Sequence, residues 1–370
     1  MSLRLSRLPQ ILALAALLGS STEVFAAFTL KGSLPNGGAE AQVEVLRESL
    51  EGRNLSSIVS TRIHGSEFEL QVPSETGLFT LTIGETKGTF VASENQVLSV
   101  TSASDGKSLL ISGTPDQDAY LAYERYRSAS LARLVLSVRE AVRTARASGN
   151  QSRVDELTED EVAGYNLHRR ELTDFTLAHL KGTAAIYPAS LRWDGDYRLE
   201  ELSALVVDYA ARHPGLEICR QLQERIHRFH RVARGAVAPN LTASTPAGVS
   251  LSLESLRGKV VLVDFWASWC APCRLENRHY REIHKRYRDR GFEILAVSVD
   301  TRVSDWKAAI AKDQADWLHV SDLAGWKSPL AGSWNVSALP ANFLLDREGR
   351  ILAKDLRGRS LDEALHHAMK

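Results

Sequence analysis

The sequence places two cysteines, Cys270 and Cys273, on either side of Ala271 and Pro272, and only one other cysteine occurs in its 370 residues. Such a pair can be a structural disulfide, half of a zinc site, or a redox couple that exchanges bonds with other disulfides. A structural disulfide across so short a loop adds little stability, because the chain entropy that it removes is small. A redox couple is therefore expected, provided that no metal ligands accompany the pair.

Histidines elsewhere in the sequence do not supply the second pair of ligands that a zinc site requires. His279 and His284 follow the cysteines, but they are spaced like surface residues of a helix. His227 and His230 lie three apart on a predicted helix without an obvious third ligand, and His64 lies in a predicted surface loop. We predict no metal and no cofactor other than a redox-active disulfide between the two cysteines.

The order of the predicted elements makes the two sulfurs unequal. The apolar run up to Trp266 predicts a strand, and a charged amphipathic stretch begins directly after Cys270. Cys270 should therefore lie at the N-terminus of a helix, where unpaired N–H groups and the helix dipole favour a thiolate. Cys273 lies one turn deeper and is more shielded. We expect Cys270 to attack a substrate disulfide and Cys273 to resolve the mixed disulfide.

The residues that flank the pair are expected to form its immediate surroundings. Pro272 has no N–H group and suits the first turn of a helix. Trp269 should shield the sulfurs from water, whereas Trp266 is more simply explained as part of the core. Trp269, Ala271 and Pro272 together are the expected substrate-binding surface beside Cys270.

Asp264 is a charged residue in the otherwise apolar run VVLVDFWA, six residues before Cys270. A buried carboxylate is costly unless it is paired or used. Burial should raise its pKa, which suits general acid or base chemistry. The alternative is a structural acid at the end of the strand that pairs with a cation such as Lys259.

Residues 235–370 alternate between strand and helix patterns after a linker and a turn-rich hairpin at 235–248. Continuous apolar strands flanked by helices predict a sheet that is covered on both faces. Ser304 and Ser360 are the expected N-caps of the last two helices. The predicted strands are 259–267, 292–300, 341–346 and 350–356, and the predicted helices are 271–291, 304–313 and 360–369.

Four stretches give residues 236–370 a resemblance to a known family. They are GKVVLVDFWASWCAPCR, GFEILAVSVD, ALPANFLLDREGRI and a final LRG followed by a leucine. On these motifs the region resembles the thioredoxin-fold domain of exported TlpA/ResA-type thiol-disulfide oxidoreductases. The resemblance implies an α/β thioredoxin-like domain over 235–370 with that activity. Peroxidases of the peroxiredoxin type share the fold, but they carry a proline and a threonine ahead of a lone cysteine, and FWASWC has neither.

The resemblance also implies roles for single residues. Asp264 matches a buried acid beneath the second cysteine that helps to move its proton. Pro340 matches a cis-proline that faces the cysteine pair, and the backbone of Leu339 would bind an extended substrate by strand addition. Glu276 matches an acid that either tunes the reactivity of the thiols or is only a surface residue of the helix. Arg278 stands where relatives usually carry a helix-kinking proline, so this helix is expected to be straighter.

Two further regions precede this domain. Residues 27–114 alternate apolar and polar residues between turns such as PNGG and SDGK, which predicts an antiparallel β sandwich or a small barrel. Residues 115–234 carry apolar residues at helical spacing and predict a helical segment. Cys219 in its last helix is interpreted as a small buried hydrophobe, with a third redox thiol as the alternative. Both regions resemble those attached to relatives chiefly from Bacteroidetes-like bacteria.

Residues 1–26 have the pattern of a secretory signal peptide. Arg4 and Arg7 precede an apolar run from Leu8 to Leu18, and small residues follow up to VFAA at 24–27. The alternative, a membrane anchor, needs about 20 apolar residues, and the run has about half of that. We expect a soluble exported protein, periplasmic in a bacterium, in an oxidising compartment where disulfides persist.

Composition and resemblance together limit the partners. Lys plus Arg and Asp plus Glu both number 45, so no net field favours nucleic acid or an anionic membrane. The expected substrates are protein disulfides, and a reductase in an oxidising compartment also needs a membrane electron donor. The β domain and the helical segment could bind a partner or form a dimer that presents the redox domain.

The direction of electron flow depends on the reduction potential, which the residues between the cysteines do not fix. TlpA/ResA-like relatives are mostly reductases, some of which act on apocytochrome c before haem attachment. The resemblance therefore favours a reductase of protein disulfides. A disulfide oxidase or isomerase is the first alternative, and a partner-binding protein in which the N-terminal regions dominate is the second.

Overall fold

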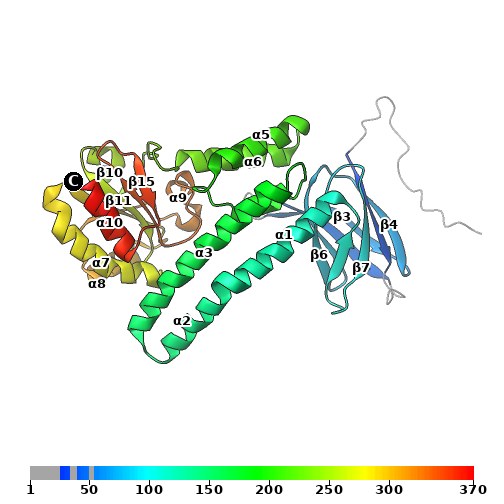
Figure 1. Cartoon of the computed structure of the whole chain (residues 1–370), viewed down its shortest axis with the longest axis horizontal. Helices are drawn as coiled ribbons and strands as arrows, with labels where there is room; N and C mark the ends of the chain where they lie inside the picture. Colours follow the sequence, from blue (N-terminus) through cyan, green and yellow to red (C-terminus); the bar gives the residue numbers. More distant parts are fainter. Residues whose placement is uncertain (1–25, 34–39, 50–53) are drawn as a thin grey trace, which may run out of the picture.

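The computed structural model describes residues 26–33, 40–49 and 54–370. The predicted signal peptide, residues 1–26, lies outside the described residues except for Ala26. Figure 1 shows three parts in sequence order: a β region in blue to cyan, long helices in cyan and green, and a sheet flanked by helices in yellow to red. No helix of the described ranges is both long and apolar enough to span a bilayer.

Two four-stranded sheets enclose one apolar core in the N-terminal region, which confirms the predicted β sandwich. The strands are β1 (Phe28–Ser33), β2 (Ala41–Glu48), β3 (Leu55–Ile63), β4 (Glu67–Val72), β5 (Gly77–Ile83), β6 (Thr86–Ala92), β7 (Val97–Ser102) and β8 (Leu109–Ser112). The sheet orders are β4-β1-β7-β8 and β3-β2-β5-β6. Strands β1 and β7 pair in parallel, an exception to the expected antiparallel pairing. Within the core, the rings of Phe28, Phe79 and Phe90 lie with centroids 4.8–5.8 Å apart.

Helices form the middle region, as the sequence predicts. They are α1 (Pro115–Leu131), α2 (Ser137–Ala147), α3 (Gln151–His179), α4 (Ile186–Ala189), α5 (Leu199–Arg212) and α6 (Glu217–Arg231). A π-helical turn, Ala132–Leu136, separates α1 from α2. A side chain at Gly164 of α3 would meet the Leu134 carbonyl oxygen at 2.2 Å, so the close approach of α3 to this turn requires glycine.

The carboxylate of Asp116 joins the sandwich to the helices. It accepts hydrogen bonds from Ser93 Oγ at 2.6 Å and from Gln96 Nε2 at 2.8 Å. It also accepts the backbone N–H of Ala184 at 2.7 Å. A buried carboxylate needs such partners, and here they fix the first turn of α1 to both regions.

The C-terminal region contains a seven-stranded sheet, which confirms the predicted α/β thioredoxin-like domain. Its order is β10-β9-β13-β12-β11-β14-β15. The strands are β9 (Thr242–Ser244), β10 (Ser250–Ser252), β11 (Val260–Trp266), β12 (Phe292–Ser298), β13 (Leu318–Ser321), β14 (Ala341–Leu345) and β15 (Ile351–Lys354), and the helices are α7 (Ala271–Tyr287), α8 (Val303–Asp313), α9 (Pro329–Ser333) and α10 (Gly358–Ala368). Strands β11, β12 and β13 are parallel, and β14 and β15 form the predicted antiparallel hairpin. The central strand β11 is buried at every position, as the continuous apolar run predicts.

Both N-cap predictions in this domain are wrong. Helix α8 begins at Val303, so Ser304 already lies inside it. Helix α10 begins at Gly358 with Arg357 as its N-cap residue, and Ser360 accepts the backbone N–H of Arg357 at 3.0 Å as the third helical residue of a capping box. A serine hydroxyl caps a helix only where the backbone places an unpaired N–H group within hydrogen-bond distance of its oxygen.

Residues 235–238, expected to be a linker, pair with the outer edge of the sheet. Gly235 N donates to Ile351 O at 2.7 Å, and Ile351 N donates to Ala236 O at 2.9 Å. Ala238 N donates to Gly349 O at 2.9 Å. The segment between α6 and β9 is therefore an ordered extension of the hairpin β14–β15 rather than a free spacer.

Candidate active site

Strand β11 and helix α7 position the two cysteines. The chain leaves β11 at Trp266 and enters α7 at Ala271, so Cys270 is the N-cap residue of the helix. The two cysteines form a disulfide with Cα atoms 5.3 Å apart, and both residues are buried. The backbone N–H of Cys273 donates to the Cys270 sulfur at 3.3 Å. The same N–H group is placed to stabilise a thiolate at Cys270 when the disulfide opens.

Polar groups fix the turn that precedes the disulfide, and the sequence analysis did not identify them. Asp300 accepts hydrogen bonds from Ser268 N at 2.9 Å and from Ser268 Oγ at 2.6 Å. Arg274 donates to Ser268 O at 3.0 Å and pairs with Asp313 at the end of α8. The one available signal was the place of Asp300 just after the apolar strand β12, since parallel strands end at a common edge of a sheet.

Asp264 lies on β11 with 2% of its surface exposed, opposite Asn342 of β14. Tyr280 Oη donates to Asp264 Oδ1 at 3.2 Å, and Asn342 Nδ2 donates to Tyr280 Oη at 3.2 Å. Burial raises the pKa of Asp264 from 3.8 to about 7, and the hydrogen bond from Tyr280 opposes that rise. Lys259, the alternative partner, pairs instead with Glu293 at 3.3 Å. The carboxyl group is therefore able to gain or lose a proton near neutral pH.

Two charged side chains act on Asp264 in opposite directions. Glu276, half-buried on α7, raises the pKa of Asp264, and Arg357 lowers it. Arg357 also donates from Nη2 to the carbonyl oxygen of Pro340 at 3.2 Å. Arg357 therefore links the surroundings of the buried acid to the segment that carries the proline.

The Leu339–Pro340 peptide bond is cis and lies directly before β14. Ala341 at the start of β14 pairs with Phe265 near the end of β11. Pro340 therefore lies at the edge of the sheet where the chain leaves β11 for the cysteines. Within the described ranges, neither the N–H nor the C=O of Leu339 has a hydrogen-bond partner, so both can meet an extended peptide.

The two tryptophans that precede the disulfide in the sequence, Trp266 and Trp269, differ in exposure. Trp266 is fully buried, as expected of a core residue, whereas Trp269 is 58% exposed. Ala271 and Pro272 are also exposed. Trp326, in the turn after β13, has its ring centroid 6.3 Å from that of Trp269 and was not anticipated from the sequence. Four uncharged, exposed residues thus accompany the buried sulfurs.

Helix α7 runs without a break through the position where relatives carry a proline. Its helical span is Ala271–Tyr287, and Arg278 lies exposed within it. His279 of the same helix faces Asp362 of α10 at 3.5 Å. Neither Arg278 nor His279 contacts the cysteines through a hydrogen bond or an ion pair in the described part of the chain.

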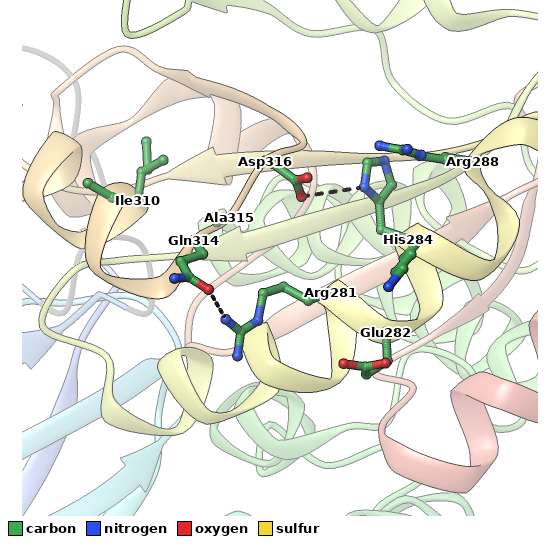
Figure 2. A pocket seen from close by; sticks show the side chains of 10 residues that line it. Arg281, Glu282, His284, Arg288, Ile310, Gln314, Ala315 and Asp316 are labelled. Carbon is green, nitrogen blue, oxygen red and sulfur yellow. Dashed lines mark hydrogen bonds and ion pairs between the residues drawn. The ribbon is translucent and has the colours of Figure 1, made fainter.

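No group of three or more His, Cys, Asp or Glu side chains that could hold a metal ion occurs among the described residues. His284 lies 3.1 Å from Glu293 and 3.8 Å from Asp316. Figure 2 shows it beside a pocket between α7 and α8 that Arg281 also lines. This pocket begins more than two turns of α7 beyond Cys273, so it is separate from the disulfide.

Cys219, the third cysteine, is buried and not part of a disulfide. Its sulfur donates to the carbonyl oxygen of His213 at 3.4 Å. Burial raises the pKa of this thiol, which makes it a poor nucleophile. Cys219 thus has the surroundings of a small buried hydrophobe.

Comparison with known proteins places the chain in a family. The profile of the AhpC/TSA family matches residues 234–354. The thiol-disulfide oxidoreductase ResA from a strain of Bacillus cereus is 30% identical over 120 residues, which cover 32% of this chain and 68% of the relative. The chain belongs to the ResA family of thiol-disulfide oxidoreductases. ResA from Geobacillus kaustophilus is 32% identical over 121 residues, which cover 32% of this chain and 67% of that protein.

A solved structure matches the same region of this ResA-family protein. The thioredoxin domain of a thiol-disulfide oxidoreductase from Bacteroides vulgatus is 37% identical, covers 37% of this chain and 99% of that chain, and has a TM-score of 0.36. The predicted enzyme class, a thiol-disulfide oxidoreductase, is confirmed by the family. The matched span 234–354 includes the cysteine pair, Asp264 and Pro340.

Proposed function

We propose that this ResA-family protein reduces disulfides of other proteins in the bacterial periplasm, with Cys270 as the attacking thiolate and Cys273 as the resolving thiol. The observation that carries the proposal is the Cys270 sulfur at the N-terminus of α7, accompanied by a buried carboxyl group with a pKa of about 7. A helix N-terminus favours the anionic nucleophile, and a buried acid that titrates near neutrality can exchange a proton with a thiol.

Reduction proceeds through two exchanges. The Cys270 thiolate attacks one sulfur of the substrate disulfide, whose bond breaks as the mixed disulfide forms, and the other substrate sulfur leaves as a thiolate that takes up a proton. Cys273 then loses its proton and attacks the Cys270 sulfur. The Cys270–Cys273 disulfide forms, and the second substrate sulfur leaves as a thiolate and is protonated. Two electrons have then passed from the protein dithiol to the substrate.

Asp264 is the proposed acceptor of the Cys273 proton. Its pKa of about 7 lets the carboxylate form at neutral pH and still bind a proton. Burial raises the pKa of Tyr280 well above 10, so its hydroxyl remains protonated and donates to Asp264. Tyr280 is therefore a positioning residue, which holds the carboxyl group rather than moving the proton.

The substrate is proposed to bind as an extended segment beside Pro340. The free N–H and C=O groups of Leu339 would bind its backbone, which is a form of strand addition. Trp269, Ala271 and Pro272 supply the exposed surface beside Cys270. The substrate disulfide would thereby be held next to the attacking sulfur.

Export and partners follow from the same proposal. Residues 1–26 would direct the chain to an oxidising compartment. Each cycle leaves Cys270 and Cys273 oxidised, so a membrane electron donor must reduce them again. Apocytochrome c is a candidate substrate, because it is reduced by some TlpA/ResA-like relatives before haem attachment. The β domain and helical segment are proposed to bind a partner or to join two copies, which sedimentation of the full chain would measure.

Cysteine variants test the assigned roles. Cys270→Ser should abolish the reduction of insulin disulfides, because the nucleophile is lost. Cys273→Ser should accumulate a mixed disulfide through Cys270, visible on a non-reducing gel and by mass spectrometry. Cys219→Ser is the matched control and should keep the wild-type rate. Normal turnover by Cys273→Ser would contradict the resolving role.

The reduction potential tests the direction of transfer. Equilibration of the full chain with a dithiothreitol or glutathione series gives the fraction of Cys270–Cys273 disulfide at each ratio. A reductase should have a potential close to that of thioredoxin, about −270 mV. A value of about −120 mV, which the oxidant DsbA has, would instead support the oxidase alternative.

A further inference from the structure

The chain buries most of its tryptophans and exposes two of them beside the disulfide. Of the seven tryptophans, Trp269 is 58% exposed and Trp326 is 51% exposed. Their ring centroids are 6.3 Å apart, although the two residues lie far apart in the sequence. The other five are 0–7% exposed; they are Trp193, Trp266, Trp306, Trp317 and Trp334.

Contacts along the edge of the sheet hold the two exposed rings in place. Trp326 lies in a tight turn whose preceding residue, Gly325, has φ +61°. A side chain at Gly325 would meet Thr301 Cγ2 at 2.8 Å, so this turn packs directly on the segment after β12. Asp300 in that segment binds both Ser268 N and Ser268 Oγ. The turn of Trp326 and the turn of Trp269 therefore rest on the same short segment.

Hydrogen bonds within the Trp326 turn add to this order. Asp322 accepts hydrogen bonds from Ala324 N at 3.1 Å and from Ser328 Oγ at 2.6 Å. The hydroxyl of Ser328 in turn caps α9. An exposed aromatic ring on an ordered support loses little entropy when a ligand covers it.

We propose that Trp326 and Trp269 form an exposed aromatic pair that selects substrates with an apolar or aromatic side chain next to the reacting cysteine. The inference rests on the proposed function, which supplies a protein disulfide at Cys270. Trp269 is bonded directly to Cys270, so a side chain that packs against the outer faces of the two rings lies beside the attacking sulfur. The exposed residues Trp269, Ala271, Pro272 and Trp326 carry no charge, so a charged neighbour of the cysteine gains no ion pair from them.

The aromatic pair fits a polypeptide segment better than a small disulfide. A ring contact of this kind changes binding by about three- to tenfold, and only a substrate longer than the disulfide itself can reach both tryptophans. Trp326 is then a specificity-determining residue for the exchange reaction. Its ring lies outside the strand–Cys–x–x–Cys segment, which is why the motif does not reveal it.

The test uses the reduced full chain in single turnovers with two peptide disulfides of equal length and charge. In one peptide the residue after the cysteine is Phe, and in the other it is Ser. Each rate is divided by the rate with hydroxyethyl disulfide, which reports thiol chemistry alone. Wild type should prefer the Phe peptide by about tenfold at low concentration, Trp326→Ala by about twofold or less, and Trp326→Phe by about fivefold.

Val303→Ala is the matched control, because Val303 is also an exposed apolar residue and lies at the start of α8. This variant should keep the wild-type preference. The proposal is overturned if wild type does not discriminate between the peptides, or if Trp326→Ala keeps the full preference. Sedimentation is measured alongside, and a dimer that Trp326→Ala disrupts would assign the pair to a second copy and overturn it as well.

Failure of the proposed function has a different signature. Because the reaction starts from chemically reduced protein, the peptide preference is measurable whether the physiological role is reduction or oxidation. If hydroxyethyl disulfide and both peptides are all inert, the cysteine chemistry itself is wrong. If all three react but without preference, only the proposed role of the aromatic pair is wrong.

Discussion

The N-terminal sandwich and the C-terminal sheet both enclose an apolar core, but they differ in the polar groups that they bury. Among the described residues of β1 to β8, no charged side chain is buried. The C-terminal sheet buries Asp264 on β11, His319 on β13 and Asn342 on β14, and Asp300 lies buried just after β12. The strands of the sandwich thus keep ionisable groups outside, whereas the C-terminal sheet has brought several inside.

The difference indicates which sheet carries chemistry. A buried ionisable group costs free energy unless it is paired or used. Asp300 is used to hold the turn of Ser268, and burial lowers the pKa of His319 to about 4, so that it stays neutral. Asp264 keeps a pKa of about 7 next to the cysteine pair. Buried ionisable groups, rather than sheet architecture, therefore distinguish the C-terminal sheet, which carries the chemistry, from the N-terminal sandwich.

The largest expected effect is on the stability of the sandwich. Phe79→Ala removes a fully buried ring that packs on Phe28 and Phe90, and such a cavity costs about 3–5 kcal/mol. Urea denaturation followed by circular dichroism should show the loss as an earlier transition. The rate of insulin reduction at a temperature where the variant is folded should not change. A slower rate in folded Phe79→Ala would show that the sandwich influences the cysteine site. The distinction between a structural sandwich and a chemically active C-terminal sheet would then fail.

Asp264→Asn should have the opposite effect on stability. The folded carboxyl group has a pKa of about 7 against 3.8 as its ordinary value, so the folded protein binds more protons than the unfolded chain between about pH 4 and pH 7. The free energy of unfolding of the wild type therefore falls as pH rises through that range. The variant should be more stable than wild type by about 4 kcal/mol at pH 8 and nearly equal to it at pH 4.

The same variant should slow the resolution of the mixed disulfide. Loss of a general base typically costs about a hundredfold, measured here as slower release of the second substrate thiol in a stopped-flow experiment. The wild-type rate should rise with pH through about 7, and the variant should lose that step. A variant that is both destabilised and fully active would show that Asp264 is a structural acid.

The alternation of strand and helix patterns, with the four stretches that carry the resemblance, predicted the C-terminal architecture, and the apolar run around Asp264 predicted its burial. Each of these features is set by consecutive residues, since an apolar strand with one acid leaves that acid inside. Tyr280, Asn342 and Trp326 could not be predicted in the same way. They reach the site from separate segments, and only the packed sheet brings those segments together.

Residue patterns were a poorer guide at an exposed strand and at the ends of two helices. Strand β3 has no clear alternation of apolar and polar residues in the sequence, because serine and threonine occupy several of its positions, and all of its residues are partly or fully exposed. Ser304 and Ser360 were placed at helix starts on residue type alone, although the position of a helix end depends on backbone geometry within one or two residues. These features are helix ends and an exposed strand, whose positions depend more on packing and backbone geometry than on the propensity of single residues.

The smallest effect is expected at a surface pair. Lys354 Nζ lies 2.6 Å from Asp196 Oδ1 and joins β15 to the helical segment. Because Asp196 is partly exposed, Lys354→Gln should change the free energy of unfolding by about 1 kcal/mol or less, and less still at high salt. Lys31→Gln, which removes an exposed pair with Glu69 on the sandwich, is the control and should have no measurable effect. A large loss in Lys354→Gln would mean that exposed charge also matters in this domain.

The pairing of residues 235–238 with β15 has a consequence for self-association. An outer strand with unpaired backbone groups can act as a template for another chain and start aggregation. Here the connection that leaves α6 occupies that position itself, with Val237 opposite Arg350. On this side of the sheet, a foreign strand would first have to displace the protein's own chain, whereas the unpaired backbone of Leu339 leaves the opening for a peptide next to the cysteines.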